Sequence, residues 1–180
     1  MSLTACAITS DIALDCRDSN GGIEKVFVAN MDGVVTFTTA SVTGCSDQID
    51  EISLDGTPLT SGDFFTFDVP KQTSNLVETA TISSENGTVF YEQVVSLVFN
   101  KLQCSTRDQL LLLAQNTRLL IVVKDNNGSY WTVGLERGAE MTAGTAETGT
   151  AYGDRNGYTV TITGREKEMA YNVDPTLLPA

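Results

Sequence analysis

The chain contains no histidine, and this absence excludes the most common general base together with the Ser–His and Cys–His pairs of nucleophilic enzymes. Imidazole ligands for a metal are excluded for the same reason. The four cysteines lie too far apart for a Cys-x-x-Cys metal site, and we expect them to be reduced and partly buried. They are Cys6, Cys16, Cys45 and Cys104. The sequence therefore predicts no enzyme, no catalytic residue, no metal site and no cofactor.

Long apolar runs are missing as well. Even a run as long as Leu110–Ala114 falls far short of the roughly 20 apolar residues that cross a bilayer, so we expect a soluble protein with no membrane contact. Near the start, Leu3–Cys6 resembles the box before a lipid-modified cysteine, but neither a basic nor an apolar export segment precedes it. The sequence therefore predicts synthesis in the cytoplasm.

Positive charge is scarce, because 11 basic residues stand against 23 acidic ones and the net charge is −12. Nucleic-acid-binding proteins use Lys and Arg to displace counterions from phosphates, so most of this surface would repel DNA. The commoner interpretation of such a charge is an ordinary acidic surface. The alternative is a surface that lies beside DNA without binding it, and charge alone does not separate the two.

What the sequence does contain is a regular series of short, β-branched apolar segments. The chain has 180 residues, 41% hydrophobic and 19% charged, which is enough to bury one core. Turns such as Glu85–Gly87 and Asn126–Gly128 separate the segments, and their Asn-Gly pairs suit tight hairpins. This pattern predicts a mainly β fold, an antiparallel β-sandwich or barrel. The nine predicted strands are Ile23–Ala29, Val34–Thr39, Ile49–Leu54, Phe64–Val69, Leu76–Ser83, Thr88–Phe99, Leu119–Lys124, Tyr130–Glu136 and Tyr158–Gly164.

Two of these strands indicate which faces are buried. Tyr158–Gly164 alternates apolar residues with threonine, which suits a strand with one packed face and one polar face. The strand that begins at Thr88 is apolar at nearly every position between Val94 and Phe99. We therefore expect it to be a central strand that is buried on both faces.

One α-helix is predicted at about residues 106–116, flanking the sheet. Thr106 is expected to cap it, with Gln109 completing a capping box and Asp108 meeting the positive end of the helix dipole. The residues that follow are good helix formers. A single amphipathic helix among so many strands would pack across a sheet face or an open end of the sandwich.

Between Arg137 and Asp154 the chain consists almost entirely of small residues. Such a segment has no apolar face with which to pack, and a long loop inside a compact domain is usually functional or disordered. We expect 138–154 to be an assembly loop that becomes ordered only against a neighbouring copy. Its candidate inter-subunit residues are Glu140, Met141, Thr142, Thr145, Glu147, Thr148 and Tyr152. The loop belongs to a β-sandwich domain at 22–165, which lies between an N-terminal arm at 1–21 and a C-terminal arm at 166–180.

Three stretches together form a family pattern that spans most of residues 8–165. The opening stretch comprises Ile8–Ile12 and Asp15–Ile23, leading into Val26–Ala29. The central stretch is the predicted helix followed by Leu120–Tyr130, and the last combines Gly138–Met141, Thr148–Gly149 and Asp154–Tyr158 before a threonine-rich strand and Gly164. These turn and strand patterns resemble the major tail, or tail-tube, proteins of long-tailed bacteriophages.

This resemblance implies a β-sandwich with a flanking helix, of which six copies close into a ring and the rings stack into a hollow virion tail tube. Strands of each subunit would line the bore, through which genomic DNA passes without specific binding. The partners would be further copies and other tail proteins, such as the tape measure, the tail terminator and the baseplate or hub. The loop and both arms would connect neighbouring rings, with Ile8, Ile12, Tyr171 and Val173 as candidate inter-ring residues.

Other functions stay open at this point. The same fold recurs along the tail axis, so the chain could be a ring or connector component elsewhere in a phage tail. A monomeric β-sandwich binding module, of the fibre or carbohydrate-binding type, would instead expose Trp131 and Tyr130 as a stacking platform and order the 138–154 loop within one monomer. A core position is the commoner role for such aromatics. An enzyme is disfavoured because no reactive groups converge.

Overall fold

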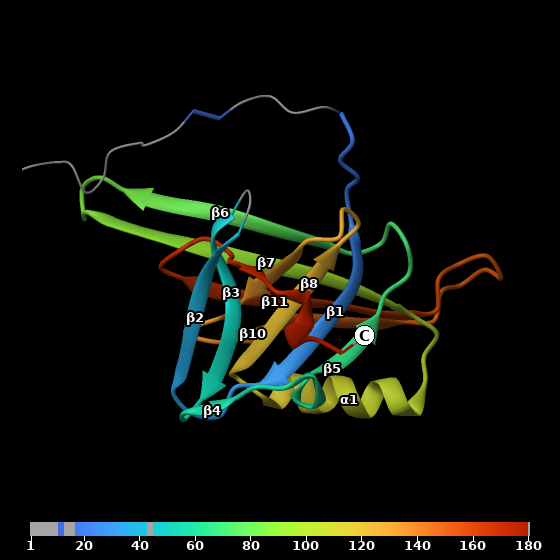
Figure 1. Cartoon of the computed structure of the whole chain (residues 1–180). Helices are drawn as coiled ribbons and strands as arrows, with labels where there is room; N and C mark the ends of the chain where they lie inside the picture. The colour runs from blue at the N-terminus through green and yellow to red at the C-terminus, as the bar shows by residue number, and fades with distance from the viewer. Residues whose placement is uncertain (1–10, 13–16, 43–44, 180) are drawn as a thin grey trace, which may run out of the picture.

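The computed structural model describes residues 11–12, 17–42 and 45–179 (Figure 1). Strands account for 52% of the chain and helices for 11%, which confirms the predicted mainly β fold of sandwich or barrel type. Within the described part, one α-helix, α1 (Cys104–Gln115), accompanies a continuous sheet of 12 strands. Two 3-10 turns, Ser61–Asp63 and Pro175–Leu177, complete the described elements.

All nine predicted strands are present, although their ends differ from the prediction by a few residues. The hairpin turns at Gly87 and Gly128 have positive φ angles of 63° and 87°, which is the conformation that their Asn-Gly pairs indicate. The nine strands are β1 (Ile23–Asn30), β2 (Val35–Val42), β3 (Cys45–Leu54), β5 (Phe65–Asp68), β6 (Asn75–Ser83), β7 (Thr88–Asn100), β8 (Leu119–Asp125), β9 (Tyr130–Val133) and β11 (Gly157–Glu166). Three further strands were not predicted: β4 (Thr57–Pro58), β10 (Ala139–Glu147) and β12 (Asn172–Val173).

The sheet follows the order β2-β3-β12-β9-β8-β10-β11-β7-β6, and β1 also pairs with β8 and carries β5 on its other side. The pairs along this path are antiparallel, except that β12 runs parallel to β3. β10 meets β8 through a single residue pair, Ala139 with Leu119, so the sheet divides at this point. We call β6, β7, β10 and β11 the projecting sheet, and the remaining strands the body.

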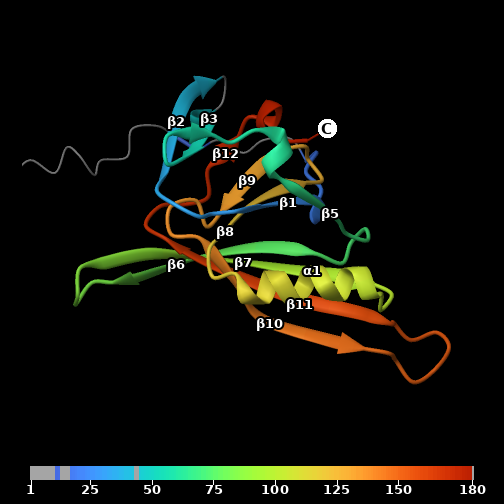
Figure 2. The same ribbon diagram turned by 90° about the horizontal axis from the view of Figure 1, so that it is seen from below.

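The projecting sheet extends beyond the body in both directions along its strands (Figures 1 and 2). The β6–β7 hairpin reaches out at one end, and the loop between β10 and β11 reaches out at the other. α1 lies alongside the projecting sheet, close to β10 and β11 (Figure 2).

Two hydrophobic cores lie on opposite faces of β1 and β8. Val28 and Ile121 face the projecting sheet and pack with Val160 and Ile162 in the first core, to which α1 adds Leu110 and Leu113. The alternate residues of the same two strands face β3 and the C-terminal segment. Together with residues of the neighbouring segments they form the second core. Its members are Phe27, Ala29, Ile49, Ile52, Phe64, Leu120, Val122, Leu135, Val173 and Leu178. β1 and β8 are therefore the strands that are buried on both faces.

The burial predicted for β7 is only partly right. β7 does lie inside the projecting sheet, between β11 and β6. Its core face is buried, with Val95 and Leu97 fully covered, but Val94 and Val98 on the opposite face are only half-buried. The apolar composition of this strand correctly predicted a central position in the sheet. The prediction that its second face is covered is wrong, because no element of the described chain lies over that face.

α1 begins two residues earlier than predicted, so Thr106 and Gln109 lie inside the helix and the expected capping box is wrong. Gln103 takes the N-cap position with extended backbone and makes no side-chain capping hydrogen bond. Asp108 is not in the first turn, and its carboxylate forms an exposed ion pair with Arg107 at 2.9 Å. The predicted C-terminal end is confirmed, because the N–H of Asn116 donates to a carbonyl of the last turn.

The C-terminal segment is part of the body, so the predicted arm at 166–180 is wrong for its described residues. β12 pairs with β3 and with β9, which places the tail between two strands of the body. Val173 and Leu178 are buried in the second core. These two apolar residues therefore cover the monomer's own core and are unavailable to a neighbouring copy.

Candidate assembly surface

The segment predicted as an assembly loop is mainly a strand. β10 (Ala139–Glu147) pairs with β11 from Ala139–Gly164 to Glu147–Gly157, with an irregularity in register between Met141 and Ala143. The small side chains of β10 bury little surface themselves, and the pairing comes from the strongly alternating neighbour β11. Only the residues between Glu147 and Gly157 form a loop, so the prediction of a loop over 138–154 is wrong for the larger part of that range.

The predicted inter-subunit residues of this segment are indeed mostly exposed. Glu140, Thr142, Thr145 and Glu147 lie on β10, and the hydroxyl oxygens of Thr142 and Thr163 on β11 are 3.0 Å apart. Thr148 and Tyr152 lie in the loop, where Tyr152 is fully exposed. The loop is ordered within the monomer by Asp154 rather than by a second copy. Its carboxylate accepts hydrogen bonds from the backbone N–H groups of Thr150 and Ala151, and these bonds lower its pKa.

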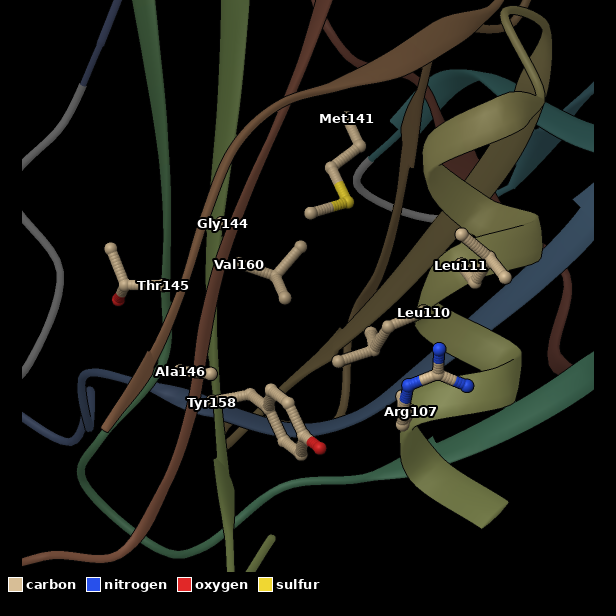
Figure 3. A pocket seen from close by; sticks show the side chains of 9 residues that line it. All are labelled: Arg107, Leu110, Leu111, Met141, Gly144, Thr145, Ala146, Tyr158 and Val160. Carbon is tan, nitrogen blue, oxygen red and sulfur yellow. The ribbon is translucent and has the colours of Figure 1, made fainter. Parts of the chain in front are cut away.

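Met141 differs from the other predicted residues, because its side chain is half-buried against the first core and lines an open groove of about 250 Å³. The groove lies between α1 and the two strands β10 and β11 (Figure 3). Its lining is largely apolar, with the guanidinium of Arg107 at one side (Figure 3). Leu111 on α1 also lines the groove and is 48% exposed. An apolar groove that remains open in the monomer is typical of a contact surface.

A second exposed apolar site lies at the tip of the β6–β7 hairpin, which sequence reasoning missed. Ile82 is 71% exposed and Val89 50% exposed, and the two residues face each other across the hairpin. The alternation of β6 places Ile82 on the same face as Leu76, so the sequence signalled an apolar face along the whole strand. The sequence did not indicate that β6 extends past the body, which leaves Ile82 exposed (Figure 1).

The helix carries an exposed apolar pair that the sequence did signal. Leu110–Leu113 is a run of four leucines, and a helix cannot turn four consecutive side chains toward one core. Leu110 and Leu113 are buried, whereas Leu111 and Leu112 are exposed.

Both long edges of the projecting sheet are largely unpaired within the chain. β6 pairs with β7 along one side only, and the described strands provide no partner for its other side. β10 pairs with β11 along its whole length, but on its other side the single strand pairing in the described part of the chain is that of Ala139 with Leu119 of β8. Free edges of this length are templates for pairing with another chain.

The face of the projecting sheet that points away from the core is rich in threonine and also carries apolar residues, among them Val77 and Phe90, which are 48% and 37% exposed. Thr159, Thr161 and Thr163 of β11 lie on this face, opposite the buried Val160 and Ile162. Two ion pairs lie on it as well: Arg165 with Glu92 at 2.8 Å, and Arg155 with Glu147. Two arginines of this face are therefore already paired with carboxylates of the same chain.

A buried polar network connects the two hairpins of the projecting sheet to the body. The carboxylate of Glu166 is 6% exposed and accepts 3.0 Å hydrogen bonds from the backbone N–H groups of Glu136 and Arg137. Burial raises the pKa of this carboxyl, and the two N–H donors partly oppose the rise. The side chain of Gln93 on β7 donates to Glu78 on β6 and accepts from the N–H of Gly134.

The candidate inter-ring residues do not form one surface. Ile8 lies outside the described residues, and Ile12 is fully exposed. Val173 is completely buried in the second core, so its prediction as a contact residue is wrong. Tyr171 is half-buried against Phe37, with a ring-centroid distance of 5.5 Å. Its hydroxyl donates to Glu168, and this hydrogen bond raises the pKa of Tyr171 to about 12.

The proposed aromatic platform is absent from the described surface. Trp131 is half-buried, and its indole N–H donates to the carboxylate of Asp125 at 3.2 Å. Tyr130 packs toward Phe27 of the second core, and Lys124 lies over its ring at 5.9 Å. The two aromatics therefore serve the packing of β8 and β9, which was the commoner interpretation of the pair.

Metal-binding clusters and membrane-spanning helices are both absent from the described residues. No group of three or more Cys, Asp or Glu side chains in that part of the chain is arranged to hold a metal ion. None of its helices is long and apolar enough to cross a membrane. Cys104 is exposed with a free thiol, contrary to the expectation of partial burial, and the side chains of Cys6, Cys16 and Cys45 lie outside the described residues.

No protein-family model matches this chain, and no curated protein sequence matches it significantly.

Proposed function

We propose that this chain is a structural virion protein whose copies form stacked, hexameric rings of a phage tail tube that conducts genomic DNA. The observation that carries the proposal is the projecting sheet, with its two free edges, its threonine-rich outer face and its extension beyond the body at both ends. The resemblance of the sequence to tail-tube proteins gives the proposal its number of copies and its place in the virion.

The strand directions of the projecting sheet suit a closed ring. β10, β11, β7 and β6 alternate in direction, so an even number of strands separates the two free edges. When identical copies stand side by side in one orientation, β6 of one copy therefore runs antiparallel to β10 of the next. Such a head-to-tail contact uses two different surfaces of the same molecule, and a head-to-tail contact can close into a ring.

The outer face of the projecting sheet suits a passive bore. In a ring closed through these edges the body lies outside, and the threonine-rich face lines the channel. Hydroxyl groups and internally paired arginines offer few free cations to DNA phosphates. The net charge of −12 per copy favours the same outcome, since a strongly acidic assembly repels DNA.

Electron microscopy of the purified chain tests this proposal directly. We expect six-fold rings or tubes about as wide as a phage tail. Rings that never stack would indicate a connector component of the tail, in which case the other tail proteins supply the neighbours. A chain that remains monomeric at all concentrations and binds glycans would contradict the proposal.

A further inference from the structure

The apolar tip of the β6–β7 hairpin belongs to the core face of the projecting sheet, but none of the described residues covers it. Ile82 and Val89 lie directly opposite each other, and alternation places them on the same face as Leu76 and Val95. Val95 is fully buried by the body, whereas Ile82 and Val89 are 71% and 50% exposed. The hairpin continues the core face past the point at which the body ends (Figures 1 and 2).

A complementary apolar surface lies at the opposite edge of the same sheet. The groove lies between α1 and β10, a strand whose other long side is largely unpaired, and Leu111, Met141 and Val160 line it (Figure 3). This groove also belongs to the core side of the sheet, because its floor includes Val160 of the first core. The tip and the groove are therefore on the same side of the sheet at its two different edges.

We propose that Ile82 and Val89 of one copy pack into the α1–β10 groove of the neighbouring copy. This inference rests on the proposed function, since it requires β6 of one copy to lie beside β10 of the next. Strand pairing across that junction makes the two core faces continuous, so the uncovered apolar tip meets the uncovered apolar groove. The contact buries apolar side chains that a monomer leaves in water.

The residue pairs within the monomer define the register that this contact needs. Met141 pairs with Ile162, which pairs with Val95, which pairs with Leu76, so Met141 and Leu76 are level across the sheet. Ile82 is six residues further along β6 (82 − 76 = 6). A stagger of about six residues between adjoining sheets therefore brings Ile82 beside Met141, and closed barrels require staggered strands.

The same register brings charged residues of the two copies together. Because β6 and the neighbouring β10 run in opposite directions, residues beyond Ile82 approach the start of β10. Glu85 in the hairpin turn would then lie close to Gly138, which is flanked by the exposed Arg137 and packs against Arg118, with the exposed Glu136 and Glu140 also near it. The charges at this point are therefore mixed, and a second copy is favoured as the occupant by the antiparallel free edges and by the apolar tip and groove on the same side of the sheet.

A charge-swap cycle at Ile82 and Leu111 tests the contact. Both side chains are exposed in the monomer, so Ile82→Lys and Leu111→Asp should leave its thermal unfolding unchanged. Each single variant should raise the protein concentration at half-assembly by more than about tenfold in analytical ultracentrifugation. The double variant should recover most of that loss, because the two new charges attract each other across the junction. Met169→Lys is the matched control, since Met169 is 60% exposed and lies outside the contact, and it should assemble normally.

The outcomes separate this contact from the proposed function. If the unmodified chain forms rings and Ile82→Lys forms them equally well, the contact is wrong while the ring stands. The contact is also wrong if the double variant assembles no better than its weaker parent, because the two sites then fail independently. An unmodified chain that never assembles would overturn the ring and the contact together.

Discussion

In the body, β8 buries five consecutive residues, Leu119–Val123, whereas β10 in the projecting sheet buries only Ala139. The first strand is held by apolar side chains on two faces, and the second by backbone pairing with β11 along one edge. The comparison teaches that the two regions have different tasks. Most of the buried apolar residues lie in the body, whereas the projecting sheet has two free edges and an exposed apolar hairpin tip, which in the proposed ring would face other copies.

The largest expected effect is a difference in the free energy of unfolding between two alanine substitutions, one in the body and one in the projecting sheet. Ile121→Ala on β8 removes a fully buried side chain and should lower the free energy of unfolding by about 3 kcal/mol, since the surrounding strands cannot fill the cavity. Ile82→Ala at the hairpin tip should change it by less than about 0.5 kcal/mol, because the side chain is already in water. Urea unfolding of both variants, followed by circular dichroism on monomeric protein, measures the difference. Equal losses at the two positions would break the division into body and projecting sheet.

The next effect concerns the point at which the two regions join. Glu166→Ala leaves the buried N–H groups of Glu136 and Arg137 without their acceptor, and should cost about 2–4 kcal/mol in the free energy of unfolding. Glu166→Gln is the matched control, because both bonds end on one carboxylate oxygen and an amide oxygen can replace it. Urea unfolding at neutral pH should therefore rank the glutamine variant well above the alanine variant. A glutamine variant as unstable as the alanine variant would show that the charge itself is needed.

The pH dependence of unfolding in the unmodified chain and in Glu166→Gln tests whether the pKa of Glu166 is raised in the folded state. Burial raises the pKa of Glu166 in the folded chain, so the unfolded chain loses this proton at a lower pH. Between the two pKa values the folded state binds more protons, and the contribution of Glu166 to stability falls as the pH rises. The stability of Glu166→Gln relative to the unmodified chain should therefore increase from acidic to neutral pH. Unfolding measured across that range gives the difference, and a difference that is constant with pH would contradict the direction of the shift.

The same contrast explains how much of the structure could be predicted from the sequence. Strands with an apolar pattern of their own were predicted, because β11 alternates apolar residues with threonine and β8 is a short continuous apolar run that ends at a turn. β10 was missed because the cause of its pairing lies in another strand, and β12 because two residues carry no period. The exposure of β10 and of the loop after it was predicted, because small polar residues cannot form an apolar core face. The exposed tip at Ile82 was missed because exposure there depends on where the body ends, which is a long-range property of the fold.

The smallest expected effect lies in the loop between β10 and β11, at the end of the projecting sheet opposite the hairpin tip. Asp154→Ala removes the acceptor of the Thr150 and Ala151 N–H groups, so these amides should exchange with solvent faster while the free energy of unfolding stays nearly unchanged. Asp154→Asn is the control, because its amide oxygen keeps an acceptor in the same turn. The two hydrogen bonds lower the pKa of Asp154, so the loop should loosen in the unmodified chain only when the pH falls through that lowered value. Hydrogen exchange measured by mass spectrometry resolves this loop from the strands. If exchange in β10 also accelerates, then the loop supports the free edge of the projecting sheet, and the deletion of its tip would impair ring closure.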